Sequence, residues 1–182
     1  MVLDLDETLV YTEPIYGEFQ QVPGERYYFD GSTVYRIKLR PHFHHFLIQA
    51  ALLYDIGVWT ASENNYAINV CQCFPEEALP VLVYTEKRCV KKHTTMVSEF
   101  DYGITIIKPL EKIWRRKKWS KFDTVVVDNT PSTYSRNYGN AIRAVDYTGQ
   151  EDDDDLFRIL DVLRRIADEP NVREGLRKAR QN

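Results

Sequence analysis

The sequence predicts an α/β fold: a parallel β-sheet flanked by helices, with a small antiparallel β insert after the first strand and no large cap domain. Three observations predict it. Short apolar runs end in polar residues, a tyrosine-rich stretch with turn residues follows the first run, and an amphipathic run lies near the C-terminus. With 182 residues, 43% of them hydrophobic, the chain can bury one core and is short for two. We therefore expect one domain over residues 1–182.

The first apolar run, residues 2 and 3, is followed by two carboxylates, Asp4 and Asp6. Alternate side chains of an extended chain point to one side, and open α/β sheets bind ligands at the carboxyl ends of their strands. Two close anions both ionise easily only beside a cation, and oxygen ligands favour Mg²⁺ over zinc. The pair suits phosphoryl transfer, with Asp4 attacking phosphorus and Asp6 acting as acid and base. A solvated acidic turn is the alternative for this motif taken alone.

Residues 11–39 are predicted to form the insert, because short strand-like runs alternate with turn signals there. Asp30-Gly31 favours a tight hairpin turn. These strands are expected to pair antiparallel.

Residues 55–59 predict a buried strand that ends in Thr60-Ala61-Ser62, before a helix from about Asn64 to Cys73. The Thr60 hydroxyl and the Ala61 amide suit a phosphate, because hydroxyl and free N–H groups at a helix start bind anions. The alternative is that Ser62 serves only as the N-cap of the helix.

Residues 104–107 predict another strand of the same sheet, ending at Lys108. Pro109 suits the first position of a short helix containing Leu110, Ile113 and Trp114. The Lys108 ammonium would supply the fixed positive charge that a phosphate site needs. A solvated lysine is the alternative.

Residues 124–127 form the clearest strand of the chain, and Asp128-Asn129 follows it. This acid and amide can complete the oxygen shell of a metal at the same sheet edge. An ordinary Asx turn is the alternative.

The acidic run at residues 151–155 precedes an amphipathic helix over about residues 156–166. The negative charge of the run is favourable there, because the N-terminus of a helix carries a partial positive charge. Residues 168–182 are expected to form a C-terminal helical tail, with an exposed helix in the Arg- and Lys-rich stretch beyond Pro170. Residues 114–119 form a basic run, for which a solvated helix end is the preferred interpretation and an acidic partner the alternative.

The order and spacing of five motifs decide which family the sequence resembles. They are Leu3-Asp4-Leu5-Asp6-Glu7-Thr8-Leu9-Val10, Arg40-Pro41-His42, Trp59-Thr60-Ala61-Ser62, Lys108-Pro109-Leu110 and Val127-Asp128-Asn129-Thr130-Pro131. Together they resemble the haloacid dehalogenase superfamily, and more narrowly the FCP/SCP group, phosphatases of the RNA polymerase II carboxy-terminal domain (CTD). The resemblance runs to about residue 167 and implies a Rossmann-like sheet. Residues 54–62 and 107–114 are most similar to the branch with a ubiquitin-like domain, which acts on the proteasome.

The resemblance implies roles for single residues. Asp4 is similar to the phospho-accepting nucleophile of the family and Asp6 to its general acid and base. Thr60 and Lys108 are similar to its phosphate-holding pair. The implied Mg²⁺ ligands are the Asp4 carboxylate, the Asp6 backbone carbonyl, Asp128, Asn129 and waters.

In this family an insert at the same position roofs the site and forms an apolar slot, where a proline next to the phosphoserine rests. Packing of the small sheet onto the domain is the alternative role for each aromatic residue of the insert. The candidates for substrate contacts are Phe19, Tyr27, Tyr28, Phe29, Tyr35 and Arg88.

The sequence therefore predicts a Mg²⁺-dependent phosphoserine/phosphothreonine protein phosphatase that acts through an aspartyl-phosphate. The expected partner is a phosphorylated protein, such as an RNA polymerase II CTD-like tail or a proteasome-like target. Two alternatives are a catalytically inactive binding protein of the same fold and a small-molecule phosphatase. The complete set of site residues favours an enzyme, and the lack of a large cap favours an open, protein-accessible site.

Charge and cysteine usage bound the setting. A net charge of −3 argues against a binder held by nucleic-acid phosphates. The odd number of cysteines favours a reducing, intracellular compartment, and the resemblance favours the nucleus. No apolar stretch reaches the ~18 residues of a membrane span. Only three residues precede Asp4, fewer than usual in this family, so we expect further sequence upstream of Met1.

Overall fold

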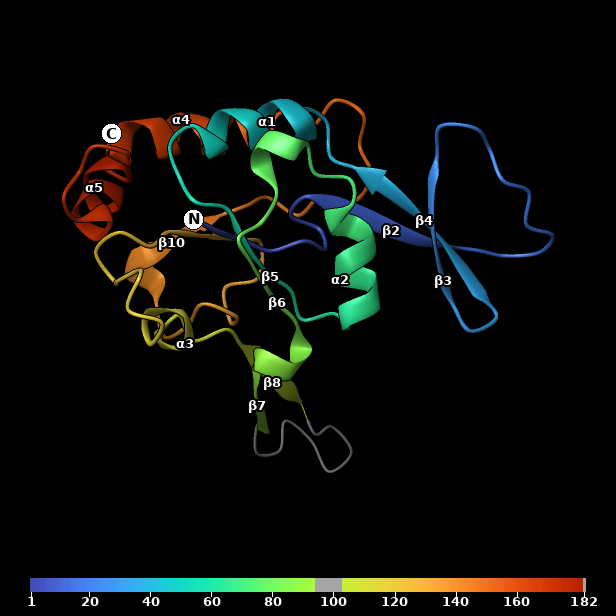
Figure 1. Ribbon diagram of the computed structural model, residues 1–182, viewed down its shortest axis with the longest axis horizontal. Coiled ribbons are helices and arrows are strands. Elements are labelled where there is room, and N and C mark those ends of the chain that lie inside the picture. The colour runs from blue at the N-terminus through green and yellow to red at the C-terminus, as the bar shows by residue number, and fades with distance from the viewer. Residues whose placement is uncertain (94–102, 182) are drawn as a thin grey trace.

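The computed structural model describes residues 1–93 and 103–181. At its centre is a five-stranded parallel sheet with the strand order β10-β9-β1-β5-β6 (Figure 1). The first strand is the middle one: Val2 pairs with Gly57 on one side and with Val126 on the other. The strands are β1 (Val2–Leu3), β5 (Gly57–Trp59), β6 (Leu82–Tyr84), β9 (Val126–Asp128) and β10 (Ala141–Arg143).

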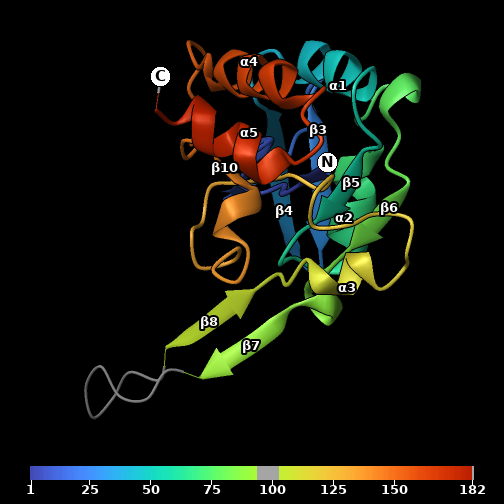
Figure 2. The ribbon, with the colours of Figure 1, turned by 90° about the vertical axis from the view of Figure 1, so that its left-hand side faces the viewer.

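Helices and loops cover both faces of this sheet. Alternation along each strand divides its side chains, so that Leu3 and Val127 join the larger core and their neighbours Val2 and Val126 the smaller one. Helices α1 and α4 lie side by side over the larger core (Figures 1 and 2). The helices are α1 (Phe43–Ala51), α2 (Asn64–Cys71), α3 (Glu111–Trp114), α4 (Asp155–Ile166) and α5 (Val172–Ala179), with 3-10 turns η1 (Glu76–Ala78), η2 (Glu86–Arg88) and η3 (Tyr138–Asn140).

The predicted insert is a separate antiparallel sheet of order β2-β4-β3, which projects from the body in Figure 1. Its strands are β2 (Val10–Ile15), β3 (Arg26–Asp30) and β4 (Thr33–Leu39). Asp30 pairs with Thr33, so Gly31 and Ser32 make a two-residue turn, and Gly31 has the positive φ of 56° that such turns require. The predicted fold class is confirmed, and no large cap domain occurs within the described ranges.

The prediction that residues 104–107 belong to the parallel sheet is wrong. Strand β8 (Ile104–Ile107) pairs antiparallel with β7 (Val90–His93), and this hairpin projects away from the body (Figure 2). Ile104 is 56% exposed, whereas a strand of a parallel sheet is covered on both faces. The two outermost strands of the parallel sheet are β6 and β10, and neither was predicted from the sequence. Residues 94–102, within the long stretch before Lys108, lie outside the described part.

Three local expectations also need correction. Pro109 precedes Leu110, the N-cap of α3, and is therefore not the first helical residue. Glu63, rather than Ser62, is the N-cap of α2. The C-terminal segment is more than an exposed tail: Leu176 of α5 joins the larger core, and a Cβ on Gly175 would lie 3.0 Å from a methyl group of Ile166. Glycine at that position therefore allows α5 to approach α4 closely.

Two findings bear on the environment of the protein. In the described ranges, no helix is both long and apolar enough to cross a bilayer. Cys71, Cys73 and Cys89 are free thiols.

Candidate active site

A tight turn directly after β1 carries the two acidic residues. The Leu5 carbonyl accepts hydrogen bonds from three amides, those of residues 8–10, and Glu7 adopts a left-handed φ of 56°. The Leu5 side chain is wholly buried and anchors the turn in the core. Asp4 and Asp6 therefore flank an anchored residue at the carboxyl end of the central strand.

Lys108 links the ends of β1 and β9. Its Nζ lies 2.5 Å from Oδ1 of Asp4 and 2.8 Å from Oδ2 of Asp128. All three side chains are buried. When both carboxylates are ionised, two anions surround one ammonium, so the cluster carries an excess negative charge that would attract a further cation.

Thr8 lies between the predicted nucleophile and the β9 end. Its Oγ1 is 3.3 Å from Oδ2 of Asp4 and 3.3 Å from Oδ1 of Asn129. It also accepts a hydrogen bond from the backbone N–H of Asn129 at 3.2 Å. The side-chain amide of Asn129 donates from Nδ2 to Glu7 and Asp146, which turns its Oδ1 toward Thr8. Asp128 Oδ1 also accepts from the Thr130 amide, so the Asx turn, which was the sequence alternative for Asp128-Asn129, is present.

Asp6 lies in a second, adjoining cluster made of hydroxyl groups. Its Oδ2 accepts from Oγ1 of Thr60 at 3.1 Å and from Oγ of Ser62 at 2.7 Å. Its Oδ1 accepts from the Tyr66 hydroxyl at 2.5 Å. The Thr60 hydroxyl also accepts from the Ser62 amide, which closes the turn between β5 and α2 around half-buried Ala61. Hydroxyl groups from the turn after β5 and from α2 therefore hold the Asp6 carboxylate.

Burial sets the electrostatics of the first cluster. Burial raises the pKa of Asp4 to about 7, although the ammonium of Lys108 opposes the shift; Asp128 adds to it. Burial alone would lower the pKa of Lys108, but the charges of Asp4 and Asp128 outweigh it and raise that pKa above its ordinary value. Lys108 therefore keeps its charge at neutral pH, whereas burial works against the ionisation of Asp4.

A buried arginine binds the backbone of the turn that carries Asp4 and Asp6. Arg40 is 1% exposed, donates from Nη1 to the Thr8 carbonyl at 2.9 Å, and pairs with Asp153 through Nε and Nη2 at 2.6 and 2.7 Å. The acidic run at residues 151–155 therefore does more than start α4. It supplies the counter-charge for an arginine that fixes the turn.

A cavity of about 330 Å³ opens beside Asp6. Tyr28 of β3 and Tyr35 of β4 form one wall and Tyr66 of α2 another, so the insert borders the site as expected. The Tyr28 hydroxyl donates to the carboxylate of Glu63 across the cavity.

The other candidates for substrate contacts do not line this cavity. Tyr27 and Phe29 lie on the opposite side of β3 from Tyr28, and both pack edge-on against Phe19, with ring centroids 5.0 and 5.6 Å apart. Arg88 in η2 lies over the ring of Tyr84, at 5.3 Å from its centroid. The five aromatic residues therefore divide between two faces of the insert, as strand alternation requires.

Residues 1–173 match the family described as NLI interacting factor-like phosphatase. The chain belongs to this family. A probable C-terminal domain small phosphatase of Dictyostelium discoideum is 31% identical over 187 residues, covering 100% of this chain and 55% of the relative. Nuclear envelope morphology protein 1 of Saccharomyces cerevisiae is 27% identical over 187 residues, covering 97% of this chain and 41% of the relative. The chain thus spans about half the length of these curated relatives.

A solved structure shares the fold of this family member. The fission yeast RNA polymerase II CTD phosphatase Fcp1, as a variant bound to beryllium fluoride, aligns with a TM-score of 0.58 and 18% identity. The alignment covers 99% of this chain and 50% of that chain. At this identity the likeness shows the fold alone.

The first cluster fits a magnesium ion. Its side-chain donors are oxygens only, from Asp4, Asp128 and Asn129, with no sulfur or imidazole among them. Within the described ranges, no group of three acidic, histidine or cysteine side chains is close enough to hold a metal. Mg²⁺ is compatible with that, because it often binds one or two carboxylates and keeps several waters.

Four residues around the site were given no site role from the sequence. The hydroxyls of Thr8, Ser62 and Tyr66 and the guanidinium of Arg40 all contact the turn or its carboxylates. Two of them could have been found: Thr8 follows Asp6 by the same two-residue step that separates the carboxylates, and Tyr66 lies one helical turn after Ser62. The pairing of Arg40 with Asp153, 113 residues away, has no local signal.

Proposed function

We propose that this protein is a Mg²⁺-dependent phosphoserine/phosphothreonine protein phosphatase that works through an aspartyl-phosphate on Asp4. The observation that carries the proposal is the convergence of the strand ends: one ammonium contacts the carboxylates of Asp4 and Asp128, and Asp6 lies beside them on the Thr60 hydroxyl. Membership of a phosphatase family supports it.

In the first step a carboxylate oxygen of Asp4 bonds to phosphorus while the bond from phosphorus to the serine or threonine oxygen breaks. Asp6 gives a proton to that leaving oxygen. In the second step water attacks the phosphorus of the aspartyl-phosphate, Asp6 takes the proton of the water, and inorganic phosphate and free Asp4 result. The Asp6 carboxylate accepts hydrogen bonds from three hydroxyls, as an ionised carboxylate does. The ionised form is the one that acts as the base in the second step.

The phosphate would be held by Lys108, Thr60 and the Ala61 amide. The metal ligands would be the carboxylates of Asp4 and Asp128, the Asn129 amide oxygen and the Asp6 backbone carbonyl. When bound, Mg²⁺ would neutralise charge on the phosphate oxygens. Thr8 would orient two of these ligands, because its hydroxyl lies between Asp4 and Asn129.

Access to the site supports a protein substrate. Exposed Asp30 and exposed Glu63 are among the residues that line the cavity beside Asp6, which supports the entry of an extended peptide. A tail like that of RNA polymerase II is one candidate, since a mouse relative carries the name carboxy-terminal domain RNA polymerase II polypeptide A small phosphatase 2. A proteasome-like target, as in the ubiquitin-like-domain branch, is the other. A nuclear setting is part of the same proposal.

A phosphopeptide panel with Mg²⁺ and with EDTA tests this function. We expect phosphate release from phosphoserine or phosphothreonine peptides with Mg²⁺, none with EDTA, and none from Asp4→Asn under either condition. Asp161→Asn, an exposed acid of α4, is the matched control and should retain full activity. Failure to hydrolyse any phosphopeptide would favour a binding protein, and faster turnover of sugar phosphates would favour a small-molecule phosphatase.

A further inference from the structure

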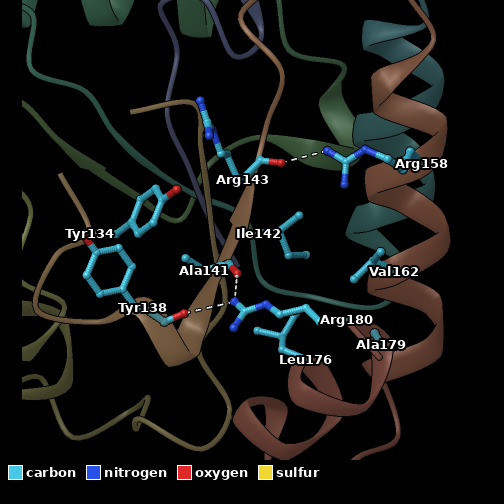
Figure 3. Close-up of a pocket in the computed structure, with 10 residues that line it drawn as sticks. All are labelled: Tyr134, Tyr138, Ala141, Ile142, Arg143, Arg158, Val162, Leu176, Ala179 and Arg180. Carbon is cyan, nitrogen blue, oxygen red and sulfur yellow. Dashed lines mark hydrogen bonds between the residues drawn. The ribbon is translucent and has the colours of Figure 1, made fainter. Parts of the chain in front are cut away.

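A second hollow, of about 460 Å³, lies along the free edge of the parallel sheet (Figure 3). Strand β10 forms its floor, and α4 and α5 form one wall. None of its lining residues belongs to the proposed catalytic set. We call it the edge groove; it is lined by Tyr134, Tyr138, Ala141, Ile142, Arg143, Arg158, Val162, Leu176, Ala179 and Arg180.

The charge of the edge groove is opposite in sign to that of the chain. Three arginines and no acidic residue line it, whereas the chain carries a net charge of −3. Arg158 is balanced in part by Asp155, at 2.5 Å. Arg180 bonds only to backbone carbonyls among the described residues, and Arg143 is exposed. Arg180 also borders a smaller hollow, which is lined by Arg173, Arg177 and one acidic residue, Glu174.

The arginines close the sheet edge to another strand. Nη2 of Arg180 donates to the Ala141 carbonyl at 2.7 Å, and Nη2 of Arg158 donates to the Arg143 carbonyl at 2.7 Å (Figure 3). These carbonyls face outward from β10 and are the acceptors that an added strand would need. Because guanidinium groups already occupy them, the occupant must bind through side chains.

The apolar part of the groove is hollow rather than convex. Ile142 and Val162 lie between Arg158 and Arg180, and Ala179 lies beside Arg180, whereas the ring of Tyr138 lies across β10 from them (Figure 3). A hollow of this kind suits an inserted apolar side chain, whereas a membrane surface would need a protruding apolar patch. Guanidinium groups on both sides suit carboxylates that flank this side chain.

We propose that the edge groove is a docking site for an acidic protein segment that inserts one apolar or aromatic side chain between carboxylates. Arg143 pairs in register with Asp128, the last residue of β9. One end of the edge groove therefore opens at the carboxyl ends of the strands, where the proposed catalytic site lies. Two strand spacings, roughly 10 Å, separate the backbones of β10 and β1. A segment bound here would be held near the site without touching it.

Selection from a phage-displayed random dodecapeptide library on the immobilised protein tests the proposal. We expect enrichment of peptides with aspartate or glutamate on both sides of an apolar residue. Ala179→Glu, which places a carboxylate in the hollow, and Arg143→Glu should each weaken binding of the enriched peptide by about tenfold or more. Arg116→Glu changes the net charge as much as Arg143→Glu does, but at an exposed site outside the groove. The affinity of this variant for the enriched peptide should match that of the wild type.

Three outcomes would overturn the proposal. The first is enrichment without the acidic and apolar pattern, or no enrichment. The second is equal loss of affinity in Arg116→Glu, which would make the effect one of net charge. The third is loss of binding to vesicles of phosphatidylcholine and phosphatidylserine in Arg143→Glu, without any peptide binding. Hydrolysis of an aryl phosphate should be unchanged in every variant, so this test stands apart from that of the proposed catalytic activity.

Discussion

The Tyr66 hydroxyl lies 2.5 Å from Oδ1 of Asp6 and also 2.7 Å from Oγ1 of Thr12. It thereby ties the proposed acid and base to α2 on one side and to the insert on the other. Burial, followed by the charge of Asp6, raises the pKa of Tyr66, so the phenol stays neutral and remains a donor.

Tyr66→Phe should therefore slow turnover of an aryl phosphate by about tenfold or more. Loss of one hydrogen bond to a charged group costs about 1.5–3 kcal/mol, and 1.4 kcal/mol is a factor of ten. Steady-state kinetics at saturating Mg²⁺ measure this. Tyr16→Phe is the control, because Tyr16 is 88% exposed. Unchanged kinetics in Tyr66→Phe would show that Asp6 keeps its orientation without the phenol.

Thr8→Val should weaken Mg²⁺ binding by about 10- to 100-fold, the usual effect of removing a group that orients metal ligands. Valine keeps the shape of threonine but removes the hydroxyl between Asp4 and Asn129. Titration of activity with Mg²⁺ measures this. We expect a higher Mg²⁺ requirement with a nearly unchanged maximal rate. A lower maximal rate at the same Mg²⁺ requirement would contradict the orienting role.

Arg40→Ala should destabilise the fold by about 3–5 kcal/mol, because it leaves the Asp153 carboxylate without its buried partner. Denaturant unfolding measures the change. The double variant Arg40→Met with Asp153→Asn should recover part of the stability, since neither charge then remains. Equal stability of the single and double variants would mean that packing, rather than charge, explains the loss.

The same pair predicts a pH dependence. Burial disfavours the ionised form of Asp153, but the hydrogen bonds and charge of Arg40 prevail and lower its pKa below 3.8. A lowered pKa contributes stability that is complete above the unfolded value and is lost as the pH falls through the folded value. The stability difference between the wild type and Asp153→Asn should therefore be constant from neutral pH to about 5 and narrow below about 4.

Asp4→Asn should unfold no more easily than the wild type in the absence of Mg²⁺. Burial raises the pKa of Asp4 to about 7, so the folded state binds this proton more tightly than the unfolded state does. The wild type then loses stability as the pH rises from the unfolded value near 3.8 to about 7, whereas the asparagine variant does not. Thermal unfolding between these pH values, with and without Mg²⁺, measures the difference. A variant that is less stable at every pH would contradict it.

Local patterns in the sequence predicted most of the parallel sheet and the clustering of the first site. Asp4 and Asp128 each lie at the end of a strand of that sheet, so residue type and position sufficed for them, whereas Lys108 reaches them from the end of β8, outside that sheet. The same rule failed for the sheet membership of residues 104–107, because a short apolar run does not show whether its second face is covered.

The supporting contacts were less accessible to sequence reasoning. The pairing of Arg40 with Asp153 and the division of the insert aromatics between two faces depend on how distant segments pack. Strand alternation alone could have separated Tyr28 from Tyr27 and Phe29, but only the bounds of β3 show where it applies.

Borohydride trapping tests the central claim most directly. The protein is mixed with a phosphopeptide and Mg²⁺, quenched during turnover and reduced, and the peptide containing residue 4 is analysed by mass spectrometry. An aspartyl-phosphate is reduced to homoserine, so we predict homoserine at position 4 that requires both substrate and Mg²⁺. Phosphopeptide turnover without homoserine at position 4, or with homoserine at another aspartate, would contradict Asp4 as the nucleophile.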